Sequence, residues 1–469
     1  MRCKSCRGGS IWMNIGRYSA VCGVPKMVMP PVPESDEKAA EYVGATYRSR
    51  RRRRDPIDPS VDPYTIPLDQ LNVANPELFK ADLVGAYFTR LRDEAPVHFC
   101  PDSQYGAYWS ITRFQDIVAV DMNHAVFSSE ARLGGISLAE RPPEEMFPSF
   151  IAMDQPRHDA QRKTVNPIVA PGNLARLEST IRERVCRILD GLPVGEEFDW
   201  VQRVSIELTT QMLATLFDFP FEERRLLTWW SDMATGDPDG NGPVKSWEQR
   251  RSELGKCQDY FTRLWNERVN AEPRNDLISM MAHAPATRSM LPSEFLGNLI
   301  LLIVGGNDTT RNSISGGLLA LNRNPAEFDK LRANPALVSS LVPEIIRWQT
   351  PLAHMRRTAL SDSEIGGKTI RMGDKVVMWY LSGNRDEEAI ENAGRFIVDR
   401  AQPRRHLSFG FGIHHCMGSR LAEMQLEILW EEILKRFDRI DVVGEPVRTK
   451  SNFVHGFVSM RVVIPARRV

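Results

Sequence analysis

Residues 409–418, Phe-Gly-Phe-Gly-Ile-His-His-Cys-Met-Gly, constrain this chain more than any other segment. Gly410 and Gly412 allow the backbone to pack flat against something broad and rigid, where a Cβ atom would clash. Cys416 follows, and Gly418 then precedes an amphipathic stretch that predicts a helix. The amides and dipole of such a helix favour an anion at the sulfur. The segment therefore indicates a thiolate beside a flat group, and the alternative is a buried structural cysteine in a glycine turn.

The spacing resembles the haem-ligating signature of the cytochromes P-450, Phe-x-x-Gly-x-x-x-Cys-x-Gly. Phe409, Gly412, Cys416 and Gly418 fill its fixed positions. The resemblance implies haem b (iron protoporphyrin IX), with Cys416 as the thiolate ligand of the iron and with Phe409 and Gly418 beside the cofactor. It also implies a monooxygenase with a mainly α fold and a small β-sheet region. The haem would be buried between the helix-rich and the sheet-containing part.

Residues 1–60 differ in composition from the rest of the chain. They contain Pro30, Pro31, Pro33 and an arginine run at 50–54, with little apolar periodicity. Such a segment predicts a disordered extension, with its arginines as a solvated tail or, alternatively, attracted to a membrane surface. We expect one haem-thiolate monooxygenase domain at 61–469.

Periodic patterns appear beyond residue 61. Apolar spacing near three and four residues predicts helices at 79–91, 176–192, 261–269 and 424–437. Alternating or β-rich runs predict strands at 97–99, 108–111, 375–379 and 459–464. The chain therefore reads as mainly helical with a small sheet.

Composition excludes several function classes. Lys plus Arg and Asp plus Glu both total 60, so global charge gives no reason to expect a nucleic-acid partner. The seven cysteines are scattered and predict neither a disulfide framework nor an iron–sulfur centre. The longest apolar run, 299–304, is too short for a transmembrane segment, and the resemblance to bacterial members implies a cytoplasmic protein.

No Gly-x-Gly-x-x-Gly follows a predicted strand, so we expect neither a flavin nor an NAD(P)H module. Electrons must then come from outside the chain. The resemblance implies a ferredoxin with its ferredoxin reductase, and Arg404, Arg405 and Arg420 would form a basic surface for an acidic ferredoxin.

A polar cluster interrupts the apolar run at 299–304. Gly305 and Gly306 would weaken a buried helix for no structural benefit, and Asp308 and Thr309 follow them. The cluster resembles the family's oxygen-activation motif. The resemblance implies that the glycines open the helix for O2, that Thr309 hydrogen-bonds the oxygen being activated, and that Asp308 relays protons. A kinked helix with a capping threonine is the alternative.

A pair of oppositely charged residues also matches the family. Glu344 and Arg347 lie at i, i+3 on one helix face, and the resemblance adds Arg400 as the third member of a structural triad. Pro343 just before this pair predicts a helix that is kinked or begins late.

Haem carries two propionates, so its site needs cations. His158 and Arg162 lie at i, i+4 and point the same way from one helix. The resemblance assigns them, together with Arg357 and His414, to the propionates. The alternative for a lone His-x-x-x-Arg is a solvated helix face.

Longer strings, such as 158–165, 298–312, 344–357 and 406–409, are similar to those of soluble bacterial alkane and fatty-acid terminal hydroxylases. This implies oxygen insertion at the ω-carbon of medium-chain alkanes, fatty acids or related linear compounds. A narrow apolar channel must then present only the chain end. The candidate channel residues, each of which could equally be ordinary core, are Ile136, Leu138, Leu302, Val304, Gly305, Leu352, Ala353, Phe453 and Val454.

Two other functions stay open. One is a bacterial cytochrome P-450 that hydroxylates terpenoid, steroid or polyketide skeletons. The other is a non-catalytic haem sensor, against which Asp308 and Thr309 argue because a sensor needs no proton relay.

Overall fold

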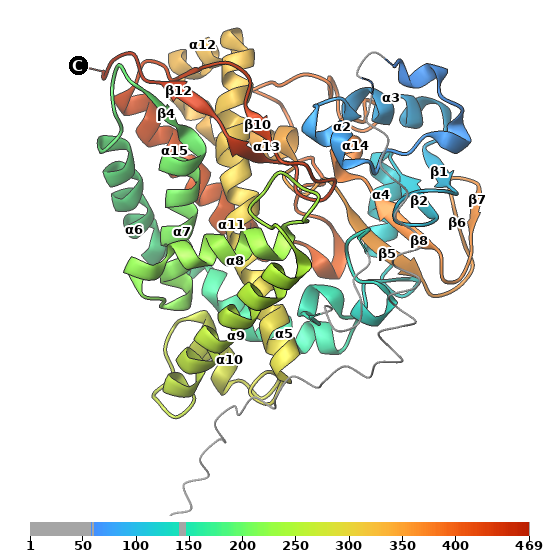
Figure 1. Ribbon diagram of the computed structural model, residues 1–469. Coiled ribbons are helices and arrows are strands. Elements are labelled where there is room, and N and C mark those ends of the chain that lie inside the picture. Colours follow the sequence, from blue (N-terminus) through green and yellow to red (C-terminus); the bar gives the residue numbers. More distant parts are fainter. Residues whose placement is uncertain (1–57, 59–60, 140–146, 469) are drawn as a thin grey trace, which may run out of the picture.

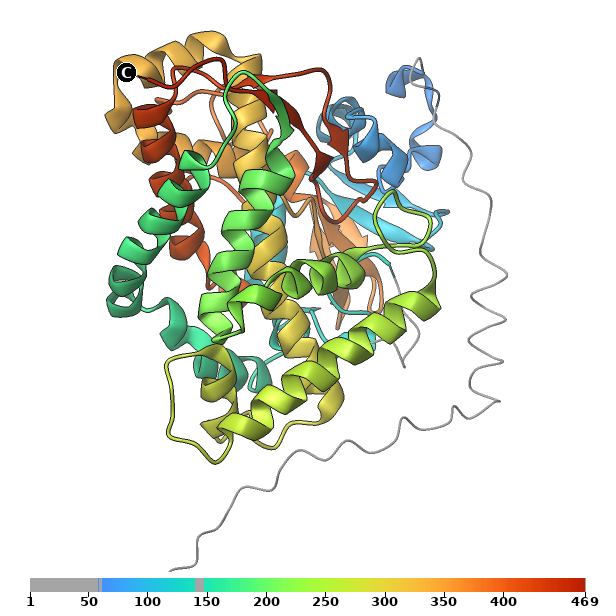
Figure 2. The ribbon, with the colours of Figure 1, turned by 60° about the vertical axis from the view of Figure 1, so that its left-hand side comes forward.

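The computed structural model describes Asp58 and residues 61–139 and 147–468. The predicted extension at 1–60 therefore lies outside the described residues, except for Asp58. The long helix α11 (Pro292–Arg323) passes through the middle of the molecule, with most other helices on one side of it and most strands on the other (Figures 1 and 2). This arrangement places one element against both parts of the fold.

Helices make up most of the described chain. Two long ones begin with proline at the first helical position, where its missing N–H is not needed. Besides α11, the α-helices are α2 (Pro76–Lys80), α3 (Val84–Glu94), α4 (Phe114–Met122), α5 (Arg157–Val165), α6 (Pro171–Asp190), α7 (Ile206–Phe217), α8 (Arg225–Thr235), α9 (Trp247–Arg268), α10 (Leu277–His283), α12 (Pro325–Ala333), α13 (Val338–Gln349), α14 (Tyr380–Gly383) and α15 (Ser419–Arg436) within the described residues.

The largest sheet has five strands in the order β1-β2-β8-β5-β3. Its strands are β1 (Val97–Cys100), β2 (Tyr108–Ile111), β8 (Lys375–Met378), β5 (Met355–Ala359) and β3 (Phe127–Ser128). Strands β2 and β8 pair in parallel, and the other pairs are antiparallel. Three smaller sheets contain β4 (Glu197–Asp199), β12 (Arg461–Val463) and β9 (Asp441–Val442); β6 (Ser363–Ile365) and β7 (Lys368–Ile370); and β10 (Val447–Arg448) and β11 (Phe457–Ser459).

The main apolar core lies among the helices. Helix α11 packs against α7, α8, α13 and α15, and its apolar residues, such as Leu299 and Ile303, are fully buried there. Separate apolar clusters hold the five-stranded sheet to α3, α4 and α14. The polar residues Asp308 and Thr309 of α11 are therefore held rigidly by the surrounding helices.

The predicted elements all exist, with corrections at their ends. The single helix expected at 79–91 is two helices, because Asp82 adopts a left-handed conformation with φ of 59° between α2 and α3. The strand expected at 459–464 divides at Met460 into β11 and β12. Pro343 neither delays nor ends α13, which begins five residues earlier at Val338. It lies in the second turn, where one lost N–H bond is tolerated.

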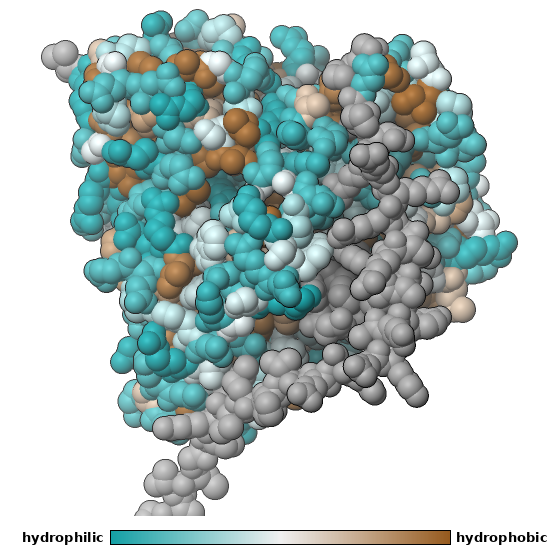
Figure 3. Space-filling model, in the orientation of Figure 1, coloured by the Kyte–Doolittle hydropathy of each residue, from teal (hydrophilic) through white to brown (hydrophobic). Residues whose placement is uncertain are grey.

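The visible surface in the orientation of Figure 1 is mainly hydrophilic, with apolar side chains in small separate groups (Figure 3). Among the described residues, no helix combines the length and the apolar character needed to cross a bilayer.

Candidate active site

A cavity of about 1750 Å³ lies between α11 and the segment 409–418. Gly305 and Thr309 line one wall, and Phe409 and Cys416 line another. Small-molecule sites typically occupy roughly 300–1,000 Å³, so this cavity can hold a large flat cofactor together with a second molecule. It is the place where the predicted site residues converge.

The glycines before the cysteine are required by the protein's own backbone. Gly410 and Gly412 have φ values of 65° and 64°, in the left-handed region. A Cβ on Gly412 would lie 2.7 Å from the carbonyl oxygen of Asp121, and one on Gly410 would lie 3.3 Å from the Asp121 carboxylate. The sequence predicted that these two glycines let the backbone approach a flat group. In the structure they instead let the loop approach the end of α4.

Cys416 is held at the start of α15. Its backbone N–H donates to the carbonyl of Phe409 at 2.8 Å, and Gly418 is the N-cap residue of the helix, as expected. Burial raises the pKa of the Cys416 thiol, while hydrogen bonds from the Gly418 and Ser419 amides and the charge of Arg162 lower it by less. The amides at the helix N-terminus lower the pKa of the thiol, as predicted, but they do not outweigh burial and so do not by themselves produce a thiolate. A metal ion deprotonates a coordinating thiol outright, so the donor set suits a metal-bound sulfur.

Two buried histidine nitrogens near Cys416 have no hydrogen-bond partner among the residues that the structure describes. The rings of His158 (α5) and His414 lie edge to face with centroids 4.5 Å apart. Asp159 Oδ1 lies 2.7 Å from His158 Nδ1, and Ser129 Oγ lies 3.0 Å from His414 Nε2. Within the described residues, His158 Nε2 and His414 Nδ1 are left without a hydrogen bond. Burial lowers the pKa of both rings, and an added carboxylate would favour their protonated forms.

The two remaining predicted cations are engaged by the protein. Arg162 hydrogen-bonds to the carbonyl of His415 and lines the cavity. Arg357 also lines it but donates to Asp121 Oδ1 at 2.8 Å, and Tyr380 donates to the other oxygen of that carboxylate at 2.7 Å. The orphaned histidine atoms and these guanidinium groups together form a donor set that fits the two carboxylates of haem.

The two glycines of α11 have different roles. A Cβ on Gly305 would meet no atom within 4 Å, so this residue leaves space in the cavity as predicted. A Cβ on Gly306 would lie 2.7 Å from Leu213 of α7, so this glycine allows close helix packing, and it lines the cavity as well. The Thr309 hydroxyl donates to the carbonyl of Gly305 at 2.9 Å and faces the cavity.

Asp308 does not reach the cavity, although it is next to Thr309. Its side chain is fully buried between α11 and α8, and it accepts hydrogen bonds from Ser231 Oγ at 2.8 Å, Asn307 Nδ2 at 3.0 Å and Thr235 Oγ1 at 3.2 Å. Arg311 lies 3.1 Å from the same carboxylate. The predicted relay acid is therefore held behind the cavity wall.

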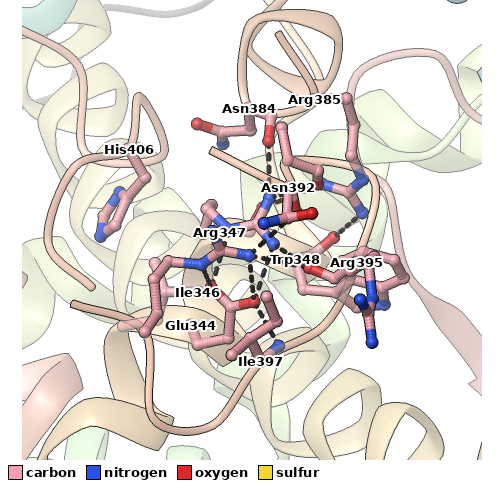
Figure 4. A network of polar contacts seen from close by, with 12 residues as sticks. Glu344, Ile346, Arg347, Trp348, Asn384, Arg385, Asn392, Arg395, Ile397 and His406 are labelled. Carbon is pink, nitrogen blue, oxygen red and sulfur yellow. Dashed lines mark hydrogen bonds and ion pairs between the residues drawn. The ribbon is translucent and has the colours of Figure 1, made fainter. Parts of the chain in front are cut away.

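The structure brings the predicted triad together. Arg347 makes a bidentate pair with Glu344, at 2.7 and 2.8 Å, and Arg400 Nε donates to Glu344 at 2.9 Å. Arg347 also donates to three carbonyls of the segment 384–395 (Figure 4). Burial raises the pKa of Glu344, but the two guanidinium groups outweigh it and lower the pKa overall. The triad fixes the segment that leads to the cysteine loop.

Most predicted channel residues line the cavity, and two do not. The cavity walls include Ile136, Leu302, Val304, Gly305, Leu352, Phe453 and Val454. A backbone bridge pairs Leu352 with Val454, so two distant segments form one wall. Leu138 and Ala353 are fully buried in the apolar cluster beside the five-stranded sheet. Their assignment to the channel is wrong, because apolar character alone does not distinguish a wall residue from core.

The arginines expected to form a basic surface lie in mixed surroundings. Arg404, Arg405 and Arg420 are exposed, but Arg404 forms an ion pair with Glu423 at 3.2 Å. Arg404 and Arg420 border a surface groove that also contains Glu178, Glu427 and Glu431. The three arginines are therefore exposed, but the surface around them carries both signs of charge rather than the basic character that was predicted.

Sequence reasoning missed several residues of the site. Asp121 joins Arg357, Tyr380 and the Phe411 amide, and His124 has a buried Nδ1 without a partner among the described residues. Tyr380 is 259 positions from Asp121, so no local pattern could have paired them.

Comparison with known proteins decides the family. A family model described as cytochrome P450, written here as P-450, matches residues 247–461. Linalool 8-monooxygenase of Pseudomonas putida is 36% identical over 406 residues, which cover 85% of this chain and 99% of that protein. The chain belongs to the cytochrome P-450 family.

The methyl-branched lipid omega-hydroxylase of Mycobacterium tuberculosis is 31% identical to this cytochrome P-450, covering 81% of this chain and 91% of that protein. The solved structure of CYP153D17 from Sphingomonas sp. PAMC 26605 is 48% identical, with a TM-score of 0.79, and the match covers 85% of this chain and all of that one.

Membership makes this protein a monooxygenase. Cytochromes P-450 carry haem b with a cysteine thiolate ligand, use O2 and receive electrons from redox partners. The cavity, the cysteine at a helix N-terminus and the two orphaned histidine atoms fit that cofactor.

Proposed function

We propose that this cytochrome P-450 hydroxylates the terminal (ω) carbon of medium-chain alkanes, fatty acids or related linear compounds, with electrons from a ferredoxin. The supporting observation is the wall of the cavity next to Gly305 and Thr309. It is built from apolar side chains of three separate segments, including Leu302, Leu352 and Phe453. The omega-hydroxylase among the relatives adds support.

Each predicted site residue has a proposed role. Cys416 would supply the thiolate ligand of the haem iron, and Phe409 and Gly418 shape the backbone around it. His158, Arg162, Arg357 and His414 bind the propionates, the histidines through the nitrogens that lack a partner within the described residues. When bound, the haem supplies the binding and reductive activation of O2 and the transfer of one oxygen atom to a C–H bond.

The chain's own residues manage protons and water. The Thr309 hydroxyl gives its hydrogen to the Gly305 carbonyl, so its oxygen can accept a hydrogen bond from a group in the cavity and pass on a proton. Asp308, held by three hydrogen bonds and by an ion pair with Arg311, stabilises charge behind this wall. The apolar side chains exclude bulk water, which strengthens polar interactions inside the cavity.

Terminal selectivity must come from geometry. A primary C–H bond is stronger than a secondary one, so an unrestrained chain would react at an inner carbon. Leu302 and Val304 on α11 and the paired residues Leu352 and Val454 limit the width of the cavity from two sides. Such walls allow a linear chain to enter end-on while its inner carbons stay away from the reacting centre.

We also propose that the ferredoxin docks near Arg404, Arg405 and Arg420. These exposed arginines lie close in sequence to Cys416. The neighbouring glutamates lower the net charge there, so docking should require matched charges rather than simple attraction. Binding should weaken as salt concentration rises.

A second candidate substrate class is a terpenoid. Linalool 8-monooxygenase matches this chain at 36% identity over nearly its whole length, a closer match than the omega-hydroxylase at 31%. A branched isoprenoid chain is wider than an alkyl chain, so the two candidates demand different cavity widths.

A substrate panel separates the two candidates. The haem-loaded protein is titrated with octane, dodecanoic acid, linalool and a steroid, and the spin-state change of the haem is recorded. The same substrates are then turned over with a ferredoxin and its reductase. Tight binding and turnover of the linear compounds would support the proposal. Preference for linalool or the steroid would overturn it in favour of the bulkier class.

A further inference from the structure

Behind the cavity wall, one guanidinium group is shared by two carboxylates from different helices. Arg311 Nη2 (α11) lies 2.8 Å from Asp232 Oδ1 (α8) and 3.1 Å from Asp308 Oδ1 (α11). The Arg311 side chain is 11% exposed and that of Asp308 is fully buried. Such a cluster carries a net negative charge when both carboxylates are ionised, which is costly in a buried place.

The two carboxylates have different surroundings. Asp308 accepts hydrogen bonds from Ser231, Thr235 and Asn307 and forms an ion pair with Arg311, a set that suits an ionised carboxylate. Within the described residues, Arg311 is the one side chain that donates to Asp232. Asp232 is 25% exposed and lines the cavity, as Thr309 does, whereas Asp308 does not line it.

The balance of charges favours a proton on Asp232. Burial raises the pKa of Asp232, Arg311 lowers it, and the nearby charge of Asp308 raises it again, with a raised pKa as the result. Burial lowers the pKa of Arg311, but Asp308 and Asp232 more than compensate, so Arg311 remains charged. One proton on Asp232 then leaves Arg311 paired with Asp308 and makes the cluster neutral.

The other charged groups facing α8 are engaged elsewhere. On α9 and α7, which pack against α8, they are Arg250, which donates to the Ala234 carbonyl, Glu253, which accepts from the indole of Trp229, and Glu207, which is held by Arg224 and Arg225.

We propose that Asp232 is the proton-carrying residue of this cluster and delivers its proton into the cavity that Thr309 lines. The O–H bond of the Asp232 carboxyl group breaks, an acceptor in the cavity takes the proton, and the electron pair stays on Asp232. The new carboxylate is held by Arg311 until a proton from solvent replaces the lost one. Asp308 acts as a positioning residue that holds Arg311. This inference rests on the proposed role of Thr309.

The first test locates the proton without turnover. The infrared spectrum of the haem-loaded protein is recorded between about pH 6 and pH 8, above the ordinary aspartate and glutamate pKa values, so that exposed carboxyl groups are ionised. Aspartate carrying a heavy carbon isotope in its side-chain carboxyl group identifies the aspartic-acid band. We expect a protonated-carboxyl band that shifts with labelled aspartate in the unmodified protein. In Asp232→Glu, the band should shift with labelled glutamate instead.

Two outcomes contradict the proposal. Absence of a protonated-carboxyl band across this range would show that both carboxylates are ionised. If the protonated-carboxyl band of Asp232→Glu still shifted with labelled aspartate, the proton would lie on Asp308 or elsewhere. Neither result depends on the substrate, so it is independent of whether terminal hydroxylation is confirmed.

The second test measures proton delivery. We expect Asp232→Asn to lower product yield per NADH by about tenfold, below the roughly 10²–10⁴-fold that a general acid typically contributes, and Asp232→Glu to restore most of it. The product yield per NADH, here called coupling, should fall in the unmodified protein as pH rises through the pKa of Asp232. This pH dependence should vanish in Asp232→Asn. Asp237→Asn is the matched control, because Asp237 lines the same cavity and makes no ion pair with Arg311 within the described residues. Equal coupling and pH profile in Asp232→Asn and Asp237→Asn would overturn the proposal.

Discussion

Asp308 and Thr309 are consecutive residues of α11 with opposite surroundings. Thr309 faces the cavity, and its hydroxyl donates to the carbonyl one turn earlier. Asp308 points to α8, where it is fully buried. Successive helical positions lie about 100° apart, so one motif can place a hydroxyl in the cavity and a carboxylate behind its wall.

Thr309→Ala should bind substrate normally but lose coupling between NADH use and product. The substitution removes the hydroxyl that can hold a proton in the cavity and leaves the helix otherwise intact. NADH consumption should continue while alcohol yield falls and hydrogen peroxide rises. Thr309→Ser is the control that should retain coupling. Unchanged coupling in Thr309→Ala would show that the proton path bypasses this hydroxyl.

Cys416→Ala should remove the long-wavelength Soret band that the reduced CO complex of a thiolate-ligated haem shows. Cys186→Ala is a matched control, because Cys186 is partly exposed on α6 and outside the cavity. The control should keep the band at full intensity. If Cys416→Ala kept it instead, another side chain would be the ligand.

Site residues that belong to a local sequence pattern could be predicted, whereas the residues that contact them from other elements could not. Cys416 and Gly418, and Glu344 with Arg347, stand at fixed spacings, and the structure places them as expected. Asp121, Ser129 and Asp232 carry no such spacing, because their partners lie on other elements. Such contacts depend on how helices pack, which a local pattern does not contain.

At the scale of elements, α11 connects the two parts of the site. It is continuous from Pro292 to Arg323, even though Gly305 and Gly306 lower its intrinsic stability. Packing on neighbouring helices, including α7, α8, α13 and α15, compensates for that loss. Apolar periodicity predicted where helices exist, but not the break at Asp82, because a left-handed residue depends on the surrounding packing.

Leu302→Ala should lower the ratio of ω to ω-1 alcohol formed from dodecanoic acid. Leu302 lines the cavity on α11, one turn before Gly305, and a shorter side chain would give the penultimate carbon room to approach. Discrimination of this kind rests on about 1–3 kcal/mol, so a several-fold change is expected. Ile303→Val is the control, since Ile303 is buried in the core and does not line the cavity. An unchanged ratio in Leu302→Ala would show that this wall does not set the position of attack.

At the scale of the whole molecule, His354 ties together three segments that are far apart in sequence. The His354 ring, just before β5, accepts the backbone N–H of Leu138 at Nε2 over 3.2 Å and donates from Nδ1 to the carbonyl of Asn452 over 2.8 Å. It therefore links the segment before residue 140 to the loop that contains Phe453. A neutral ring is required, because a proton on Nε2 would face the Leu138 N–H.

The stability of the protein should decrease as pH falls from about 6.5 toward 4. Burial lowers the pKa of His354 to about 4, so at lower pH the unfolded state takes up a proton that the folded state refuses. From neutral pH to about pH 5 this linkage amounts to about 2 kcal/mol for His354 alone. The free energy of unfolding in urea, measured for the unmodified protein and for His354→Asn, should show a difference that shrinks by this amount. A constant difference would show that His354 does not titrate as described.

The most direct test of the account is oxidation of dodecanoic acid under dioxygen labelled with heavy oxygen, with a ferredoxin and its reductase as electron source. Gas chromatography with mass spectrometry then gives the position and the isotope of the new hydroxyl group. The account predicts mainly the ω-alcohol, carrying one heavy oxygen atom from O2. Mainly in-chain alcohols, or no conversion while linalool is oxidised, would contradict terminal hydroxylation of linear substrates.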